Sequence, residues 1–235
     1  MKKGIIILSG GLDSTTLLHF LKNGGYEIYG LTFNYGQRHL KELEFAKYWG
    51  EKLCEEHKTI QLDINDIISH SALSDKSIDL PEEHYTHENQ KITVVPGRNT
   101  IMLSMAIAYA ENLNIKEVFY AAHFSDRSIY PDCRKEYITA LSLASQLGTY
   151  NNVEVKAPFV DMTKTNIVRL GLDLKVDYSK TWSCYSGKER PCLKCATCQE
   201  RTDSFILNNV KDPLLTDEEW KDAISRSEDI FEALS

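Results

Sequence analysis

Ser9-Gly10-Gly11-Leu12-Asp13-Ser14-Thr15 joins a short apolar run, Gly4–Leu8, to a segment with helical spacing, Asp13–Asn23. Two adjacent glycines let the backbone turn tightly with positive φ and bring successive N–H groups toward an anion. The N-terminus of the following helix adds a partial positive charge, and the hydroxyl side chains add further donors. The stretch therefore predicts a phosphate-binding loop between a buried strand and a helix.

The spacing of the glycines separates this loop from two common nucleotide-binding motifs. It lacks the Gly-x-x-x-x-Gly-Lys-Ser/Thr pattern of the Walker loop, including its lysine, and it lacks the Rossmann pattern Gly-x-Gly-x-x-Gly. A bare pair of glycines would more often be a tight turn with Asp13 as the helix N-cap. Six matching positions between a strand and a helix favour phosphate binding instead.

Strand and helix patterns alternate along most of the chain. The runs that predict strands are Gly4–Leu8, Tyr26–Phe33, Lys58–Leu62, Glu117–Ala122 and Val153–Val155. The runs that predict helices are Asp13–Asn23, Arg38–His57, Asn99–Leu113, Asp132–Leu147 and Thr165–Leu174, followed by a helical stretch through Asn208 and a charged segment, Asp217–Ser235. This alternation predicts the α/β class, with a doubly wound, mostly parallel five-stranded sheet.

The composition is that of an ordinary globular protein. With 42% hydrophobic and 26% charged residues among 235, it excludes a disordered chain and a disulfide-dense miniature scaffold. Its 27 basic and 34 acidic residues give a net charge of −7, so we expect a small-molecule substrate and no nucleic-acid or membrane partner. The apolar run Ile5–Leu8 is too short for a leader or a membrane span, and a cytoplasmic location is expected.

The chain divides into two expected parts. Residues 1–180 form a nucleotide-binding α/β domain, and residues 181–235 form a small helical C-terminal lobe packed on it. A polar segment at about 63–95 interrupts the alternation and is expected to be an insertion or a lid. Its histidines, His70, His84 and His87, fit a solvated loop better than a metal site.

Four of the six cysteines lie within fifteen residues near the C-terminus, in the pattern Cys184-x7-Cys192-x2-Cys195-x2-Cys198. Four thiolates are enough to close a tetrahedral zinc site, which would be structural because it leaves no open position. An iron–sulfur cluster is the competing interpretation of this spacing. Either metal fits a reducing compartment better than a disulfide framework does.

The glycine loop resembles the Ser-Gly-Gly-x-Asp-Ser loop of the PP-loop ATP pyrophosphatases. That resemblance implies a five-stranded parallel sheet, ATP bound through its phosphates with Mg²⁺, and transfer of AMP to a substrate oxygen. It also implies that Leu31–Asn34 hold the adenine through backbone groups. The expected nucleotide-binding residues are Leu8, Ser9, Gly10, Gly11, Leu12, Asp13, Ser14, Thr15, Thr16, Leu17 and Leu18.

Further motifs narrow the resemblance. Tyr35-Gly36-Gln37-Arg38-His39, Val95-Pro96-Gly97-Arg98-Asn99, Tyr130-Pro131-Asp132-Cys133-Arg134 and Thr181-Trp182-Ser183-Cys184-Tyr185 together resemble the 7-cyano-7-deazaguanine synthase family. The resemblance extends to about Asn208. It implies a ligase that converts 7-carboxy-7-deazaguanine and ammonia into 7-cyano-7-deazaguanine (preQ0) with ATP, through an adenylated carboxylate and an adenylated amide.

The resemblance also implies roles for particular residues. Asp13, Arg98 and Lys164 are expected to be catalytic, and Asn99, Asp126, Asp132 and Arg134 to bind the substrate. One structural Zn²⁺ per subunit would be held by Cys184, Cys192, Cys195 and Cys198, in a homodimer. Cys133 has no activating histidine in its motif and is expected to be a packed or substrate-lining thiol.

One departure and two rival interpretations accompany the resemblance. Arg127-Ser128-Ile129 stands where a small residue is expected before the tyrosine of the pocket wall, and Ile129 is expected to pack inward.

A transfer-RNA thiolase would also combine a glycine loop with cysteines, but it needs a basic RNA-binding surface. A non-catalytic zinc module that binds nucleic acid would leave the glycine loop unexplained.

Overall fold

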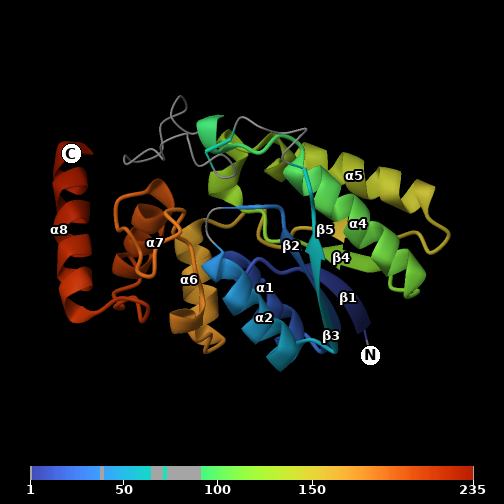
Figure 1. Cartoon of the computed structure of the whole chain (residues 1–235), viewed down its shortest axis with the longest axis horizontal. Helices are drawn as coiled ribbons and strands as arrows, with labels where there is room; N and C mark the ends of the chain where they lie inside the picture. The colour runs from blue at the N-terminus through green and yellow to red at the C-terminus, as the bar shows by residue number, and fades with distance from the viewer. Residues whose placement is uncertain (1, 38–39, 65–70, 73–90, 235) are drawn as a thin grey trace.

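One parallel sheet organises the part of the chain that the computed structural model describes, residues 2–37, 40–64, 71–72 and 91–234. The sheet has five strands in this part of the chain (Figure 1). Their order is β3-β2-β1-β4-β5. Their bounds are Lys2–Ile7 for β1, Tyr26–Asn34 for β2, Glu56–Gln61 for β3, Glu117–Phe119 for β4 and Glu154–Lys156 for β5. The predicted α/β class and the parallel five-stranded sheet are confirmed.

Helices cover both faces of the sheet. They are α1 (Leu12–Asn23), α2 (Lys41–Leu53), α4 (Arg98–Asn112), α5 (Lys135–Gly148), α6 (Lys164–Asp173), α7 (Ala196–Ile206) and α8 (Asp217–Leu234), with 3-10 turns η1 (Lys91–Thr93), η2 (Phe124–Ser128), η3 (Pro131–Cys133) and η4 (Tyr178–Lys180). One apolar cluster joins the sheet to α4 and α5, and a second joins it to α1, α2 and α6. The C-terminal helices α7 and α8 extend beyond α6 at one end of the molecule (Figure 1).

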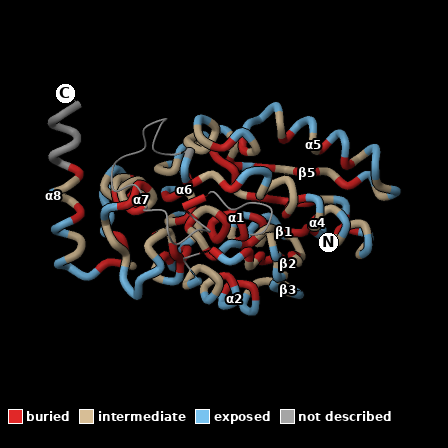
Figure 2. The backbone as a smooth tube through the Cα atoms, turned by 45° about the horizontal axis from the view of Figure 1, so that its top comes forward, coloured by how far each residue is buried: buried red, intermediate tan, exposed pale blue. Residues whose placement is uncertain are grey.

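The central strand β1 shows why the sheet needs cover on both sides. Ile5 packs in the cluster that contains Leu103 of α4, whereas Ile6 packs in the cluster that contains Leu17 of α1. All four side chains are fully buried. A continuous apolar run, without polar alternation, is typical of a parallel strand between two helical layers. In Figure 2 the central strands and α1 are accordingly dominated by buried positions.

Strand order places a crevice at the middle of the sheet. The chain proceeds outward from β1 to β2 and β3, then returns to β4 on the other side of β1. Connections after β1 and after β4 therefore leave toward opposite faces, and the crevice outside their carboxyl ends is where ligands bind in open α/β sheets. A ligand is therefore expected to bind beside the residues that follow Ile7 and Phe119.

The second helix is shorter than the predicted Arg38–His57. Of that range, positions 38–39 lie outside the described residues, and α2 ends at Leu53 because Cys54 adopts an extended conformation. His57 then pairs in β3 with Gly30 of β2, and its ring lies against Gly50, where a Cβ atom would be only 2.2 Å from it. The end of the predicted helix is therefore part of strand β3 instead.

Two further boundaries differ from the prediction. Strand β4 ends at Phe119 instead of Ala122, since the following residues leave the sheet to line the crevice. The helix predicted from Asp132 begins at Lys135, because Pro131–Cys133 forms a 3-10 turn and Arg134 is extended. The early end of β4 brings Tyr120 and His123 to the crevice, and the turn before α5 brings Cys133 to its wall.

A buried ion pair fixes the chain just before the cysteine cluster. Arg201 of α7 donates from Nε to Asp212 over 2.6 Å and from Nη1 to the Thr181 hydroxyl over 2.8 Å. Arg201 and Asp212 are 4% and 1% exposed, so the charges satisfy each other within the protein. The residues from 181 to 201, here called the metal lobe, are thereby held against the first part of the chain; a domain boundary at 180 remains a prediction.

Much of the predicted polar segment at 63–95, including His70, His84 and His87, lies outside the described residues.

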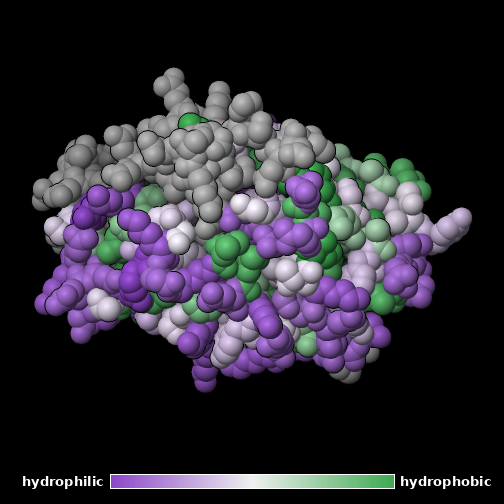
Figure 3. Space-filling model, viewed as in Figure 1, coloured by the Kyte–Doolittle hydropathy of each residue, from purple (hydrophilic) through white to green (hydrophobic). Residues whose placement is uncertain are grey.

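Within the described ranges, no helix combines the length and apolar character that crossing a membrane requires. Polar side chains dominate the face seen in Figure 3, and apolar ones gather toward the side where α5 lies.

Candidate active site

A cavity of about 240 Å³ opens at the crevice between β1 and β4. Its walls come from distant parts of the chain, including Leu8 after β1, Tyr120 after β4, Arg98 of α4 and Glu200 of α7. Titratable groups of both signs face the same space. A cavity with convergent polar groups at this position is the expected place for a ligand.

The glycine loop forms one end of the cavity. Gly10 has a φ of +79°, and α1 begins at Leu12 with Gly11 as its N-cap. The hydroxyls of Ser9 and Ser14 lie 3.0 Å apart, and Gly11 N–H donates to Ser9 Oγ over 3.3 Å. N–H groups in the first turn of a helix have no partner within the helix, so this end of the cavity is suited to an anion.

Gly10 also has no room for a side chain. A Cβ atom at this position would lie 2.1 Å from the Glu42 carbonyl oxygen and 2.5 Å from the Ala46 nitrogen of α2. The backbone of the loop therefore rests directly on the backbone of α2. This contact and the positive φ both require glycine.

Asp13 and Lys164 form the most closely paired charges in the cavity. The Lys164 Nζ atom donates to Asp13 Oδ2 over 2.6 Å and lies 3.6 Å from Glu200. Their side chains are 14% exposed for Lys164 and 22% for Asp13. Burial alone would raise the pKa of Asp13, but Lys164 and His123 outweigh it and hold the pKa below its usual value. Asp13 is therefore a stable carboxylate at neutral pH.

His123 connects this pair to a second acid. Its Nε2 atom lies 3.3 Å from Asp126 Oδ2 and 3.8 Å from Asp13 Oδ2, and the ring is 2% exposed. Burial raises the pKa of Asp126 despite the nearby His123 and Lys164. The two carboxylates beside His123 consequently have pKa values shifted in opposite directions.

Arg98 occupies the other side of the cavity, at the start of α4. Its Nη1 donates to the Tyr35 hydroxyl over 2.9 Å, and the guanidinium carbon lies 5.6 Å from the centroid of that ring. Asn99, the next residue, donates from its side chain to Cys133 Sγ over 3.5 Å. Burial raises the pKa of the Cys133 thiol, which favours the packed, pocket-lining role expected for it.

Some expected site residues lie away from the cavity wall. Asp132 accepts a hydrogen bond from the backbone N–H of Asn99 over 3.2 Å and so holds the start of α4. Arg134 is exposed and donates to the Arg127 carbonyl over 3.1 Å. Expected nucleotide-binding residues that do not line the cavity are Gly10, Thr15, Thr16, Leu17 and Leu18.

Ile129 stands where a small residue was expected before the tyrosine of the pocket wall. Ile129 is partly buried and packs against the apolar cluster on the α4 and α5 side, as expected. Tyr130, which follows it, lines the cavity with 8% of its surface exposed. The bulky residue therefore fills the core beside the cavity.

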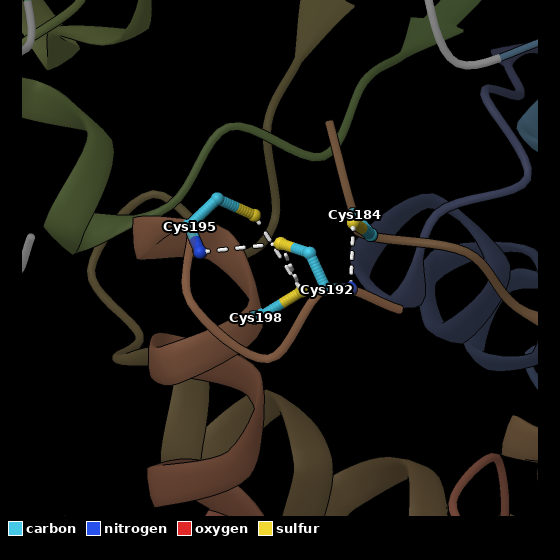
Figure 4. A group of neighbouring side chains, drawn as sticks. All are labelled: Cys184, Cys192, Cys195 and Cys198. Atoms are coloured by element: carbon cyan, nitrogen blue, oxygen red, sulfur yellow. Dashed lines mark hydrogen bonds between the residues drawn. The ribbon is translucent and has the colours of Figure 1, made fainter. Parts of the chain in front are cut away.

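The four clustered cysteines converge on one point. Their Sγ atoms all lie within 4.8 Å of one another (Figure 4), with 3.5 Å between Cys195 and Cys198 and 4.0 Å between Cys192 and Cys198. Two thiolates on one tetrahedral zinc ion, each at about 2.3 Å, are about 3.8 Å apart. A cube of iron and sulfide between the cysteines would hold their sulfurs farther apart. The geometry fits a single metal ion and is consistent with zinc.

Hydrogen bonds also favour thiolates at this point. The backbone N–H groups of Ser186 and Cys192 donate to Cys184 Sγ over 3.4 and 3.3 Å, and Cys195 N–H donates to Cys192 Sγ over 3.3 Å. Donors directed at sulfur stabilise the charged form that binds a metal.

A family model described as "Queuosine biosynthesis protein QueC" matches residues 3–209. The chain belongs to this family. The 7-cyano-7-deazaguanine synthase of Archaeoglobus fulgidus is 53% identical over 97% of this chain and 96% of that protein. The enzyme of the same name from Caldicellulosiruptor saccharolyticus is 49% identical over 90% of this chain and 94% of its own. Membership of the QueC family makes the chain an enzyme of queuosine biosynthesis.

Solved structures outside the QueC family align at lower similarity. The NMN synthetase of Francisella tularensis covers 93% of this chain and 80% of its own, with 14% identity and a TM-score of 0.49. The NH3-dependent NAD synthetase of Campylobacter jejuni covers 97% and 84%, with 19% identity and a TM-score of 0.46.

For this QueC family member, the cavity contains residues to which the sequence assigned no role. His123 is an isolated histidine after a strand, and its place at the carboxyl end of a parallel strand is the signal that could have found it. Glu200 lies two residues after the last cysteine and reaches Lys164 only through the fold. Tyr35 and Tyr185 stand inside the quoted motifs, but their approach to Arg98 depends on tertiary structure.

Proposed function

We propose that the chain catalyses the ATP-dependent conversion of 7-carboxy-7-deazaguanine and ammonia into 7-cyano-7-deazaguanine. The observation that carries this proposal is the presence, in one cavity, of an anion-binding loop with Lys164 and of a separate cation, Arg98. Such a cavity can hold the phosphates of a nucleotide together with a second, acidic substrate. The name shared by the most similar curated relatives supports this substrate and product.

The reaction requires two activations, since neither a carboxylate nor an amide has a good leaving group. A carboxylate oxygen attacks the α-phosphate of ATP, and pyrophosphate departs. Ammonia then displaces AMP and loses a proton, which gives the amide. The amide oxygen attacks a second ATP in the same way, and loss of AMP and two protons leaves the nitrile.

Catalysis of these steps depends mainly on position and charge. The N–H groups of the glycine loop and the hydroxyls of Ser9 and Ser14 would receive the phosphates. Lys164, held by Asp13, would neutralise the negative charge that develops on the departing pyrophosphate. Asp126, which lines the cavity, would accept hydrogen bonds from the donors of a guanine-like ring.

Asp13 is also suited to a magnesium ion bound with ATP. Among the described residues, its Oδ1 atom is buried without a hydrogen-bond partner, and the residue lines the cavity. Magnesium prefers such carboxylate oxygens together with substrate phosphates. The ion would lower the charge on the phosphates during the attack.

The zinc proposed for the metal lobe is structural. All four candidate ligands are cysteines, three of them buried, and together they leave no open position for substrate. Cys184, Cys192, Cys195 and Cys198 would hold the lobe in its folded form when the ion is bound.

The protein is further proposed to act as a homodimer in the cytoplasm, without nucleic acid. The outer face of α5 supports association between copies, because Leu143 and Leu147 are 57% and 81% exposed and Tyr150, just after the helix, is 99% exposed. Large apolar side chains grouped in this way are typical of an interaction surface. The net charge of −7 supports small-molecule substrates.

The test is to incubate the purified protein with ATP, Mg²⁺, ammonium and 7-carboxy-7-deazaguanine and to follow products by mass spectrometry. We expect the nitrile to accumulate with two AMP formed per product. Asp13→Ala and Arg98→Ala should abolish turnover while circular dichroism shows an intact fold. Absence of the nitrile together with modification of added transfer RNA would refute the proposal.

A further inference from the structure

Three tyrosines of the cavity lining lie near the guanidinium of Arg98. The Tyr35 hydroxyl accepts a hydrogen bond from Nη1, and the hydroxyls of Tyr130 and Tyr185 lie close enough to interact electrostatically with the charge. The tyrosines come from three separate segments: the end of β2, the turn before η3 and the metal lobe beside Cys184. All four side chains line the cavity.

Arg98 differs from Lys164 and Arg201, the other basic residues that line the cavity, in having no acidic partner among the described residues. Lys164 is paired with Asp13, and Arg201 is paired with Asp212. No carboxylate of the described residues lies within salt-bridge distance of Arg98, and the one hydrogen bond that its guanidinium makes to them goes to a neutral hydroxyl. A desolvated guanidinium without a counter-charge is costly unless an anion binds it. The surroundings of this charge therefore indicate an anionic ligand.

The surroundings of Arg98 favour a carboxylate on a flat ring over a phosphate. The hydrogen-bond donors suited to phosphate lie at the other end of the cavity, where α1 begins. Helix α1 packs on the opposite face of the sheet from α4. Five aromatic or apolar residues of the lining, the three tyrosines with Phe33 and Met102, belong to or pack against the apolar cluster on the α4 side, where Arg98 lies. A planar guanidinium matches the two oxygens of a carboxylate, and aromatic walls accommodate a planar ring.

We propose that Arg98, with Tyr35, Tyr130 and Tyr185, forms a subsite for the carboxylate of a planar heteroaromatic acid, distinct from the phosphate site that Lys164 serves. The inference rests on the proposed function, in which 7-carboxy-7-deazaguanine is the acid consumed. It adds that Arg98 discriminates the acid from the amide formed later. Arg98 thus selects the first substrate, and the glycine loop binds the nucleotide in both rounds.

Calorimetric titrations without ATP test the subsite. The ligands are 7-carboxy-7-deazaguanine and its 7-carboxamide, which has the same ring and no charge. Arg98→Gln should weaken binding of the acid about tenfold to a hundredfold, as expected for loss of a hydrogen bond to a charged group, and that of the amide less than about threefold. Arg169→Gln, an exposed change on α6, is the matched control and should affect neither ligand.

A non-hydrolysable ATP analogue supplies the opposite comparison. Its affinity should be unchanged in Arg98→Gln and reduced in Lys164→Gln. If Arg98→Gln weakens the analogue and spares the acid, Arg98 serves the phosphates and the proposal is wrong. Arg98→Lys keeps the charge without the planar guanidinium and should bind the acid with intermediate affinity. If the glutamine variant folds poorly, the lysine variant allows the same comparison between the acid and the ATP analogue.

The outcomes also separate this inference from the proposed function. A wild-type protein that binds neither the acid nor the amide would contradict the proposed function itself. A protein that makes the nitrile, yet binds the acid equally well with and without Arg98, would overturn only the subsite.

Discussion

The backbone N–H of Trp182 donates to the Gly10 carbonyl over 3.0 Å, and the indole N–H of the same residue donates to the Cys184 carbonyl over 2.8 Å. One residue, 1% exposed, therefore contacts both the phosphate loop and the first cysteine of the metal cluster. The position of the loop depends on the folded state of the metal lobe. A cluster that touches no substrate can in this way influence nucleotide binding.

Removing the metal should weaken nucleotide binding as well as stability. We expect a chelator, or Cys195→Ser, to lower the melting temperature and to weaken a non-hydrolysable ATP analogue about fivefold or more, which is a typical coupling between two sites. Cys54→Ser is the control, because Cys54 lies outside the cluster. Unchanged affinity in metal-depleted protein that remains folded would contradict the link through Trp182.

A comparison of two glycines isolates the contact beneath the phosphate loop. Gly10 and Gly25 have φ values of +79° and +78°, but only at Gly10 would a Cβ atom meet other atoms within 4 Å. Gly25→Ala should cost about 1 kcal/mol of unfolding free energy for the strained backbone, whereas Gly10→Ala should cost more and also impair nucleotide binding. Denaturant unfolding and analogue titration measure the two effects. Equal losses of stability would show that the contact with α2 is not limiting.

The Asp13–Lys164 pair should show strong coupling in a double-mutant cycle. Asp13→Asn or Lys164→Met alone leaves one charge without its partner in a largely buried place. The double variant should be more stable than the sum of the single effects predicts, by an interaction energy of about 1–3 kcal/mol. Chemical denaturation of the four proteins gives this value. An interaction energy near zero would mean that the charges are screened in the free protein.

Stability should decrease when the pH falls below about 6.5, partly through His57. Burial lowers the pKa of His57 from its ordinary value of 6.5, so the unfolded chain binds a proton more readily than the folded one. The contribution is complete above pH 6.5 and is lost as the pH falls toward the folded-state pKa. Because Thr32 donates its hydroxyl proton to Leu8, His57 donates Nε2–H to Thr32 over 2.7 Å as the neutral ring.

Melting temperatures at pH 7.5 and 5.5 check the role of His57. His57→Gln should lose less stability between these two pH values than the wild type does, even if it starts lower. Identical differences in both proteins would assign the acid sensitivity to other groups, such as the cysteine cluster.

The sequence was most informative where local chemistry decides the structure. The glycine loop, the alternation of strands and helices and the spacing of the cysteines each depend on neighbours along the chain, and the structure confirms the sheet and the grouping of the cysteines. Helix ends were less predictable. Nothing in the run Arg38–His57 indicates that its last residues pair with β2, yet His57 lies in strand β3 opposite Gly30.

The composition of the cavity depends on tertiary structure and could be predicted only in part. Asp13, Arg98, Lys164 and Asp126 line it, as expected of site residues, but the sequence does not reveal that Lys164 meets Asp13 and Glu200 while Arg98 meets tyrosines. Asp132, which was expected to bind the substrate, accepts the backbone N–H at the start of α4 and does not line the cavity, so its role in binding stays a prediction. Roles of this kind follow from distances between segments far apart in the chain.

The cavity is built from residues between Ile7 and Arg201, at nearly opposite ends of the chain. During synthesis the phosphate loop leaves the ribosome roughly 10 to 40 s before the last wall residue, at ordinary rates of elongation. Through most of that interval the nascent chain has the phosphate loop without Trp182, which bonds to it in the folded protein, and without Glu200 beside Lys164. Full nucleotide affinity is therefore expected only late in synthesis, after the segment that contains the four cysteines has emerged and folded.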